Sequence, residues 1–425
     1  MAVPPISRQQ YRGRTYTFWR GYTVNSTIGD RIRSLREFRD LTQEQLADRA
    51  GVSVDTVRKL EQNLRQSARI NTLRALARAL DVQLERLVGQ PTVTQELSEP
   101  GGGLLELRDA IQDIGMLPGV LADDDLEDPP SAGAWISTVS EATDLYWAGE
   151  YAGLSSRLPL LLRDGRAVAR ETSTDAVWRS LALAYQLGAC LATQAGHPDW
   201  AYTAVEKQLA AAQRASDPLA EGMGVSTLSW VLLRQGRWEQ AQAIAERKAD
   251  ALEPGFRRPS SDQLAVYGNL LLAAATPAAR RDSWDSALEL LTAAEDAAER
   301  SGSVRAYGSA FSVVDVRTQK VNVALAGSEN RPDKALEFSN DVVLDEISRP
   351  VHSAAYRVDV AQAQYQTGDS EGALETLLEV EADQPEWIRL QAGALATVRE
   401  MRESERRRNT QLRSLAARLG VEPVL

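Results

Sequence analysis

The sequence predicts an all-α fold in two parts, a compact five-helix domain followed by an α-solenoid of helical hairpins. Two observations carry this prediction. Alanine, leucine, glutamate and arginine dominate the 425-residue chain, and these residues favour helices. Glycines also recur 40 to 47 residues apart between helical segments, which is typical of stacked helix pairs. The length allows two or three domains with a large total core.

The charge is divided unevenly along the chain. Residues 1–90 contain 16 Arg plus Lys against 9 Asp plus Glu, a net charge of +7, while residues 91–425 contain 32 against 50, a net charge of −18. A basic segment joined to an acidic body suits a protein that contacts phosphates at one end only. A solvated surface with a chance bias is the alternative interpretation.

Composition also bounds the cellular setting. No apolar run is long enough to span a bilayer, and the start of the chain lacks a signal-peptide pattern. The single cysteine, Cys190, excludes an intrachain disulfide. We therefore expect a cytoplasmic protein with no membrane partner.

Residues 1–27 are polar, aromatic and arginine-rich, with no acidic residue. This composition predicts a flexible arm without a core of its own, which could place arginines in a DNA minor groove. A disordered tail without that role is the alternative.

Residues 41–60, LTQEQLADRAGVSVDTVRKL, predict a helix, a tight turn and a second helix. Thr42 is a candidate N-cap of the first helix, and Gly51 can adopt the positive φ at which that helix stops. Ser53 then caps the second helix. A short helix with a polar, cation-bearing outer face, held across a glycine turn, has the geometry that enters a DNA major groove.

The same domain extends over residues 28–89. Ile28, Ile32 and Leu35 form the apolar stripe of a first helix, and the helix-turn-helix pair follows it. A fourth apolar stripe spans 73–80, and residues 84–88 complete the five helices. Residues 90–130 have the composition of a linker with one short helix at 104–114. Their acidic cluster at 123–128 lacks the spacing of a calcium loop, so we expect no metal there.

From residue 131 to 385 the pattern is one of helical hairpins. Turns are expected at Gly149, Gly196, Gly236 and Gly368, with less regular units around 280–287 and 327–335. The spacing exceeds the 34 residues of a tetratricopeptide repeat, so longer helices are expected. Residues 386–425 predict two charged amphipathic capping helices, at 387–403 and 410–419.

Residues 28–89 resemble the phage-repressor-like helix-turn-helix regulators of the xenobiotic-response-element type. Ile32, the TQEQLA segment, the Gly51-Val52-Ser53 turn and the Leu60-Glu61 pair carry the resemblance. Asn63 replaces the glycine of many members, which implies a strained turn. The resemblance implies phosphate contacts by Gln43, base-edge positions at 54, 55, 56 and 59, and these DNA-binding residues in all: Gln43, Ser53, Val54, Asp55, Thr56, Arg58, Lys59 and Arg65.

The base-edge chemistry fits in part. Lys59 can donate to guanine, Asp55 can accept from cytosine, and Val54 can contact a thymine methyl group. Asp55 also lies in the first turn of its helix, where a carboxylate stabilises the helix dipole. That structural role is the alternative to base reading.

The whole chain resembles actinobacterial regulators that join this domain to tetratricopeptide-like repeats, most closely over residues 352–386. Its architecture is also distantly similar to the peptide-pheromone receptors of Gram-positive bacteria. That similarity implies a homodimer and a small ligand or short peptide in a concave groove. Counting from the turn glycines predicts that the groove is lined by Tyr146, Trp147, Gln186, Gln194, Trp230, Arg234, Asn269, Arg317, Gln362, Tyr365 and Gln366. For each of these a packed or solvated helix position is the alternative.

These observations favour a DNA-binding transcriptional regulator whose repeats dimerise and sense a small ligand, such as a signalling peptide in quorum sensing. A tetratricopeptide-like scaffold with an accessory helix-turn-helix is the alternative. We expect no enzyme, no catalytic residue and no cofactor, because the sequence has neither a phosphate-binding glycine loop nor a paired metal-ligand motif. Cys190 and His352 are expected to be packed in the core.

Overall fold

The computed structural model describes residues 27–39, 41–64, 68, 70–80, 82, 87, 103–113, 129–255, 258–404 and 409–421. Within these ranges the chain is helical apart from loops and one two-stranded hairpin, which confirms the predicted fold class. The predicted arm lies outside the described residues except for Thr27, as does most of the 90–130 segment. None of the described helices is long and apolar enough to cross a bilayer.

The amino-terminal domain contains α1 (Ile28–Phe38), α2 (Gln43–Ala50), α3 (Val54–Glu61) and α4 (Ile70–Ala79). Thr27 and Thr42 form capping boxes at the starts of α1 and α2, and the Ser53 side chain accepts from the backbone at the start of α3. Gly51 ends α2 with φ of 63°. The predicted fifth helix lies mostly outside the described residues.

One apolar core holds these four helices together. Its innermost side chains have at most 1% of their surface exposed, and they come from every helix: Ile32, Leu46, Val57, Leu60, Leu73 and Leu76. Gly29 lets α1 approach α3 closely, because a Cβ at that position would lie 2.0 Å from the backbone oxygen of Leu60. The close packing of α1 against α3 therefore helps to fix the direction of α3.

A series of antiparallel helix pairs follows. The short helix expected near residue 104, α7 (Leu104–Gln112), packs on the first pair with three fully buried side chains, so it belongs to the core of the repeats. Gly149, Gly196, Gly236 and Gly368 all have positive φ at hairpin turns, where the pattern placed them. The pairs are α8 (Ala132–Ala148) with α9 (Tyr151–Glu171), α10 (Asp175–Gln194) with α11 (Pro198–Arg214), α12 (Pro218–Arg234) with α13 (Trp238–Leu252), α14 (Ser261–Arg280) with α15 (Trp284–Ser301), α16 (Val313–Ala324) with α17 (Pro332–Ser339), and α18 (Pro350–Thr367) with α19 (Ser370–Asp383).

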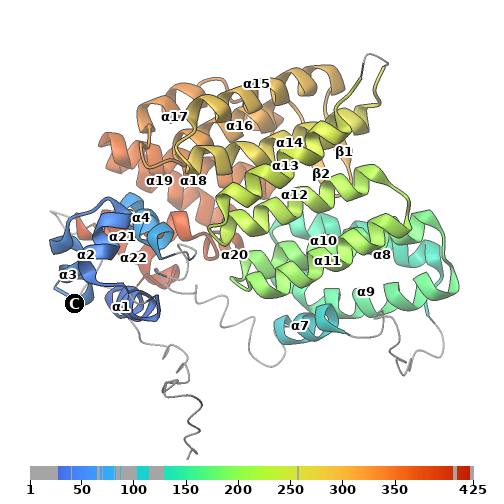
Figure 1. Ribbon diagram of the computed structural model, residues 1–425, viewed down its shortest axis with the longest axis horizontal. Coiled ribbons are helices and arrows are strands. Elements are labelled where there is room, and N and C mark those ends of the chain that lie inside the picture. Colours follow the sequence, from blue (N-terminus) through green and yellow to red (C-terminus); the bar gives the residue numbers. More distant parts are fainter. Residues whose placement is uncertain are drawn as a thin grey trace, which may run out of the picture.

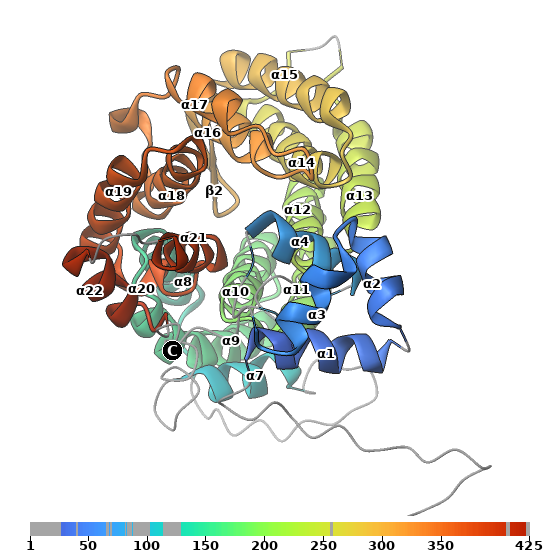
Figure 2. The ribbon, with the colours of Figure 1, turned by 90° about the vertical axis from the view of Figure 1, so that its left-hand side faces the viewer.

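The helix pairs close into a ring (Figure 2). α18 of the last pair contacts α8 of the first, and one continuous apolar core joins helices from both ends of the series. The closure is completed by α20 (Pro385–Ile388), which contacts α9. The concave side of the repeats therefore faces the inside of the ring.

The carboxy-terminal helices differ from the prediction. The helix expected at 387–403 is split into α20 and α21 (Ala392–Glu403), and α22 (Thr410–Arg418) follows. Trp387, Ile388 and Leu390 are all buried, and a turn between the helices directs these neighbouring side chains inward. α21 contacts both α18 and α4, so this segment connects the ring to the amino-terminal domain as well as capping the repeats.

A β-hairpin that the sequence did not predict lies inside the ring (Figure 2). Its strands are β1 (Val304–Ala306) and β2 (Ser309–Phe311), and its turn residues Tyr307 and Gly308 have φ of 52° and 71°. Two successive positive φ values match the twist of a tight hairpin. Phe311 anchors the hairpin at Gly268 of α14, where a Cβ would lie 1.9 Å from the Phe311 ring.

The helix-turn-helix domain stands at one mouth of the ring, with α4 nearest the repeats (Figures 1 and 2). Arg74 Nη1 donates to the Leu325 backbone oxygen at 3.0 Å, and Arg78 Nη1 lies 3.4 Å from a carboxylate oxygen of Asp282. The Arg78 guanidinium also lies 5.6 Å from the Trp238 ring. The amino-terminal domain is therefore docked on the repeats through α4.

Candidate functional site

The outer face of α3 is open to solvent. The side chains of Asp55 and Lys59 are 60% and 53% exposed, and Arg58 is exposed as well. On the opposite side of the helix, Val57 and Leu60 are fully buried in the domain core. The docked ring therefore leaves the face that could enter a major groove uncovered.

Several of the predicted DNA-binding residues in and before α3 contact one another. The Thr56 N–H donates to Ser53 Oγ at 3.2 Å, and the two hydroxyl oxygens lie 2.8 Å apart. Lys59 Nζ lies 2.7 Å from Asp55 Oδ2, one helical turn away. An exposed pair of this kind contributes little stability, so it can open at small cost. Val54 is half-buried at the helix start, and Arg65 lies outside the described residues.

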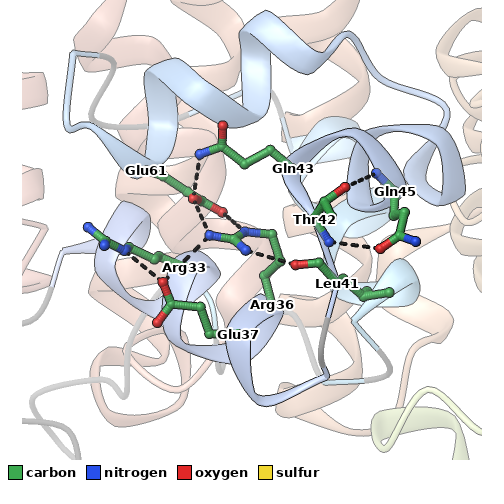
Figure 3. A network of polar contacts seen from close by, with 8 residues as sticks. All are labelled: Arg33, Arg36, Glu37, Leu41, Thr42, Gln43, Gln45 and Glu61. Atoms are coloured by element: carbon green, nitrogen blue, oxygen red, sulfur yellow. Dashed lines mark hydrogen bonds and ion pairs between the residues drawn. The ribbon is translucent and has the colours of Figure 1, made fainter.

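Gln43 belongs to a polar network that joins α1, α2 and α3 (Figure 3). Its Nε2 donates to Glu61 Oε2 at 2.7 Å, and Glu61 accepts two further bonds from Arg36, at 2.6 and 2.9 Å. Arg36 Nη1 also donates to the Leu41 backbone oxygen. The hydrogen bond to Glu61 raises the pKa of the Arg36 guanidinium. The network fixes Gln43 at the start of α2, beside the carboxyl end of α3.

Sequence reasoning noted the Leu60-Glu61 pair but missed its partner Arg36. Glu61 is only 6% exposed, and a carboxylate at that depth requires a buried cation. Asn63 follows α3 with φ of 55°, which is the left-handed conformation expected where family members have glycine. Its Oδ1 accepts from the Thr27 hydroxyl at 2.7 Å, which ties this turn to the start of α1.

A cavity of about 520 Å³ occupies the centre of the ring. It is lined by inner helices of the repeats, by the β-hairpin, and by Arg74, Ala77 and Val82 of the helix-turn-helix domain. The structure brings together seven of the predicted ligand-groove residues on this lining: Tyr146, Trp147, Gln186, Gln194, Trp230, Arg234 and Asn269.

Three of these seven residues bind the hairpin inside the ring. Trp147 Nε1 donates to the Gly308 backbone oxygen at 3.2 Å, and Gln186 Nε2 donates to the Tyr307 backbone oxygen at 3.4 Å. Asn269 Oδ1 accepts from the Ser309 hydroxyl at 3.2 Å. Side chains expected to pair with the main chain of a bound peptide thus contact the chain's own hairpin.

The other four predicted groove residues lie away from the cavity lining. Arg317 pairs with Glu295 and donates to the Asp341 backbone oxygen, and Gln362 is buried against Arg74. The Tyr365 hydroxyl lies 3.0 Å from that of Ser404, and Gln366 accepts from Asn330. The part of α18 that borders the cavity lies nearer its start and carries Val351, His352, Ala355, Tyr356 and Asp359, so the positions counted back from Gly368 are not on the lining.

Sequence reasoning also missed a cluster of ionisable residues on the lining. Arg349 is 2% exposed, and its Nη2 lies 2.7 Å from Asp315 Oδ1. His352 Nδ1 lies 3.5 Å from the same carboxylate. Burial alone pushes the pKa of Asp315 upward, but the hydrogen bond from His352 and the charge of Arg349 hold it well below its usual range. Single charged residues on helices carry no periodic signal, so the pattern did not reveal them.

Asp359 is a second carboxylate on the lining. Burial raises its pKa to about 6, against the hydrogen bond from Asn322 at 3.0 Å and the charges of Arg74 and Arg280. The folded state therefore holds this proton up to a higher pH than the unfolded chain, whose carboxyl titrates near 3.8. Stability is consequently lost as the pH rises from about 4 to about 6.

Asp359→Asn is expected to stabilise the protein at pH 7.5 by at most about 3 kcal/mol, because it removes this charge and keeps an acceptor for Asn322. The gain should shrink as the pH falls toward 4.5. Urea unfolding of both chains at several pH values measures it. A variant that is no more stable than the parent at pH 7.5 would contradict the raised pKa.

The lone cysteine is packed as expected, whereas His352, which was expected in the core, is half-buried on the cavity lining. Cys190 also borders the cavity, and burial raises the pKa of its thiol to about 12. The His197 ring is stacked on Trp200 with 3.7 Å between ring centroids, and burial lowers its pKa to about 4. Neither group has the nucleophile-and-base geometry of a catalytic pair.

Comparison with known proteins agrees with the amino-terminal geometry. Residues 32–87 match the helix-turn-helix family model. An immunity repressor protein of Bacillus phage phi105 is 39% identical over 70 residues, which are 16% of this chain and 48% of that protein. The match thus spans about half the length of that relative. Residues 32–87 are therefore a helix-turn-helix domain.

A solved structure, BtubC (BKLC) from P. vanneervenii, overlaps 60% of this chain and 92% of its own. The TM-score is 0.35 and the sequence identity 14%.

Proposed function

We propose that the protein is a sequence-specific DNA-binding transcriptional regulator that reads its site with α3. The observation that carries the proposal is the exposed, cation-bearing face of α3 in a domain that matches the helix-turn-helix family. The phage relative is described as a repressor, which agrees with this role. α3 enters the major groove, where Lys59 donates to guanine and Asp55 accepts from cytosine. Gln43, Arg58 and Arg65 contact phosphates, and the basic arm lies along the minor groove.

The regulator acts as a homodimer. One helix-turn-helix domain covers a single half-site, and two half-sites about one helical turn apart match a two-fold symmetric protein. The tetratricopeptide-like repeats supply the dimer contact.

The repeats also act as the sensor of a small ligand. The cavity is bordered by both the ring and α4, so a molecule bound there contacts both parts of the chain. A ligand that prefers one docked position of the domain shifts the relative placement of the two α3 helices, and thereby the affinity for DNA.

Selection of binding sites from random duplexes, followed by gel-shift titration, tests the proposal. We expect an inverted repeat to be enriched and bound with nanomolar affinity, and the affinity should fall steeply as salt rises. Binding that shows no preference among sequences, or that does not depend on salt, would contradict a regulator that reads DNA.

A further inference from the structure

We propose that the central cavity binds an organic carboxylate attached to a planar apolar group, with Arg349 holding the carboxylate. The inference names the chemical class of the ligand, and it rests on the proposed function only for the regulatory use of the site. Three features of the cavity carry it, namely an unsatisfied guanidinium, an excess of positive charge and an aromatic lining.

Arg349 is built into the wall in an unusual state. Its Nη2 is taken by Asp315 and by the Ala310 backbone oxygen, whereas its Nε and Nη1 have no hydrogen-bond partner among the described residues. The guanidinium lies 4.4 Å from the Trp147 ring, which fixes its plane. A buried donor without a partner is costly, and a carboxylate oxygen can accept a charge-assisted hydrogen bond from one of these two free N–H groups.

The charge of the lining also favours an anion. Four arginines border the cavity against two aspartates, Asp315 and Asp359: the arginines are Arg74, Arg234, Arg280 and Arg349. This excess of two positive charges lies inside a repeat region whose overall charge is strongly negative. A lining with more positive than negative side chains attracts an anion, and a monoanionic ligand reduces the excess.

The apolar part of the ligand is indicated by the aromatic rings. Four tryptophans border the same space: Trp147, Trp230, Trp238 and Trp387. Flat rings of this size favour stacking on a planar or apolar body, and few polar groups are then needed to orient it. The cavity thus offers an anion site and a flat apolar site within one volume.

The size of the cavity limits the ligand. A volume of about 520 Å³ suits a molecule of drug-like size. Trp147, Gln186 and Asn269 already bind the hairpin, so the donors that would pair with an extended peptide are occupied. The ligand is therefore a small aromatic acid or the last residues of a short peptide, two sources that share the same chemistry.

Titration calorimetry on the full chain tests the carboxylate requirement. The probes are naphthalene-2-carboxylate against naphthalene-2-carboxamide, and a tripeptide ending in phenylalanine as its free acid against its amide. We expect the acid of one pair to bind at least about tenfold more tightly than its neutral isostere. The pair that shows this difference identifies the source. Equal binding, or no binding, of acid and amide in both pairs overturns the proposal.

Variants locate the site. Arg349→Met together with Asp315→Asn removes the pair without leaving a lone buried charge, and it should abolish the preference for the acid. Arg317→Met removes an arginine outside the lining and should leave that preference unchanged. Equal effects of the two variants, or none from the first, place the anion elsewhere and overturn the proposal.

Gel shifts on the selected duplex keep the two proposals separate. If the parent chain binds DNA but prefers no acid, the cavity proposal fails and the DNA-binding proposal stands. If the parent chain prefers an acid but binds no DNA, the DNA-binding proposal fails and the cavity proposal stands.

Discussion

Replacing Arg58 and Lys59 together by alanine is expected to weaken binding to the selected duplex by at least about 30-fold. Both side chains are exposed on the outer face of α3 and contribute nothing to the core. A base contact and a phosphate contact each contribute roughly 1–3 kcal/mol to DNA binding, and their combined loss gives this factor or more. The melting temperature should stay near that of the parent chain, because the lost Asp55–Lys59 pair is an exposed one.

The single variants separate the two roles. Lys59→Ala should relax the preference at one base pair of the half-site, while Arg58→Ala should weaken all sequences alike and reduce the salt dependence. Gel-shift titration at two salt concentrations, on the selected duplex and on single-base variants of it, measures both effects.

A matched control removes the same two charges from the repeats. Arg237 and Lys334 belong to the repeats, where Arg237 donates to Gln235 and Gln240, and Lys334 pairs with Glu337 and lies over the Phe338 ring. Their double alanine variant should bind DNA within about twofold of the parent chain, since only long-range electrostatics changes. Equal losses in the two double variants would show that net charge, and not the α3 face, governs binding.

Glu61→Ala should destabilise the helix-turn-helix domain by about 3–5 kcal/mol. The variant leaves the Arg36 guanidinium, with a side chain only 12% exposed, without its bidentate partner and also frees the Gln43 amide. Breaking a buried pair by removing one charge carries a cost of this order. A loss this large is comparable to the whole stability of a domain of this size, so DNA binding should disappear with it.

Glu37→Ala is the matched control, because Glu37 contacts the same arginine from the surface. Its side chain is 55% exposed and lies 3.7 Å from Arg36, so its removal should cost less than about 1 kcal/mol. Urea unfolding followed by circular dichroism should show an early helical transition for Glu61→Ala only, with the ring unfolding later. Unfolding curves that coincide for the two variants would show that the network does not hold the domain together.

The amino-terminal domain was predictable because its signals are local. Thr42, Gly51 and Ser53 mark helix ends by their own chemistry, and the apolar spacing shows which side of each helix is buried. The left-handed turn at Asn63 followed from the family pattern. Arg36 was not predicted as the partner of Glu61. Glu61 is buried because three helices pack together, and a local sequence pattern does not show that packing.

The repeats were predictable as helix pairs but not as a ring. The turn glycines mark the hairpins, whereas closure depends on contacts between residues more than 200 positions apart, such as Ala152 with Glu386. The β-hairpin was missed because its strands have three residues each, too short to show an alternating pattern. The groove residues counted from Gly149, Gly196 and Gly236 lie on the lining, whereas α18 borders the cavity through residues nearer its start than those counted from Gly368.

The central claim is that the exposed face of α3 reads DNA, and the structure of the full chain bound to its selected duplex tests it most directly. The account predicts α3 in the major groove of each half-site, with Lys59 released from Asp55 and within hydrogen-bonding distance of a base edge. A complex in which the duplex lies on another surface while the outer face of α3 remains in solvent would contradict it.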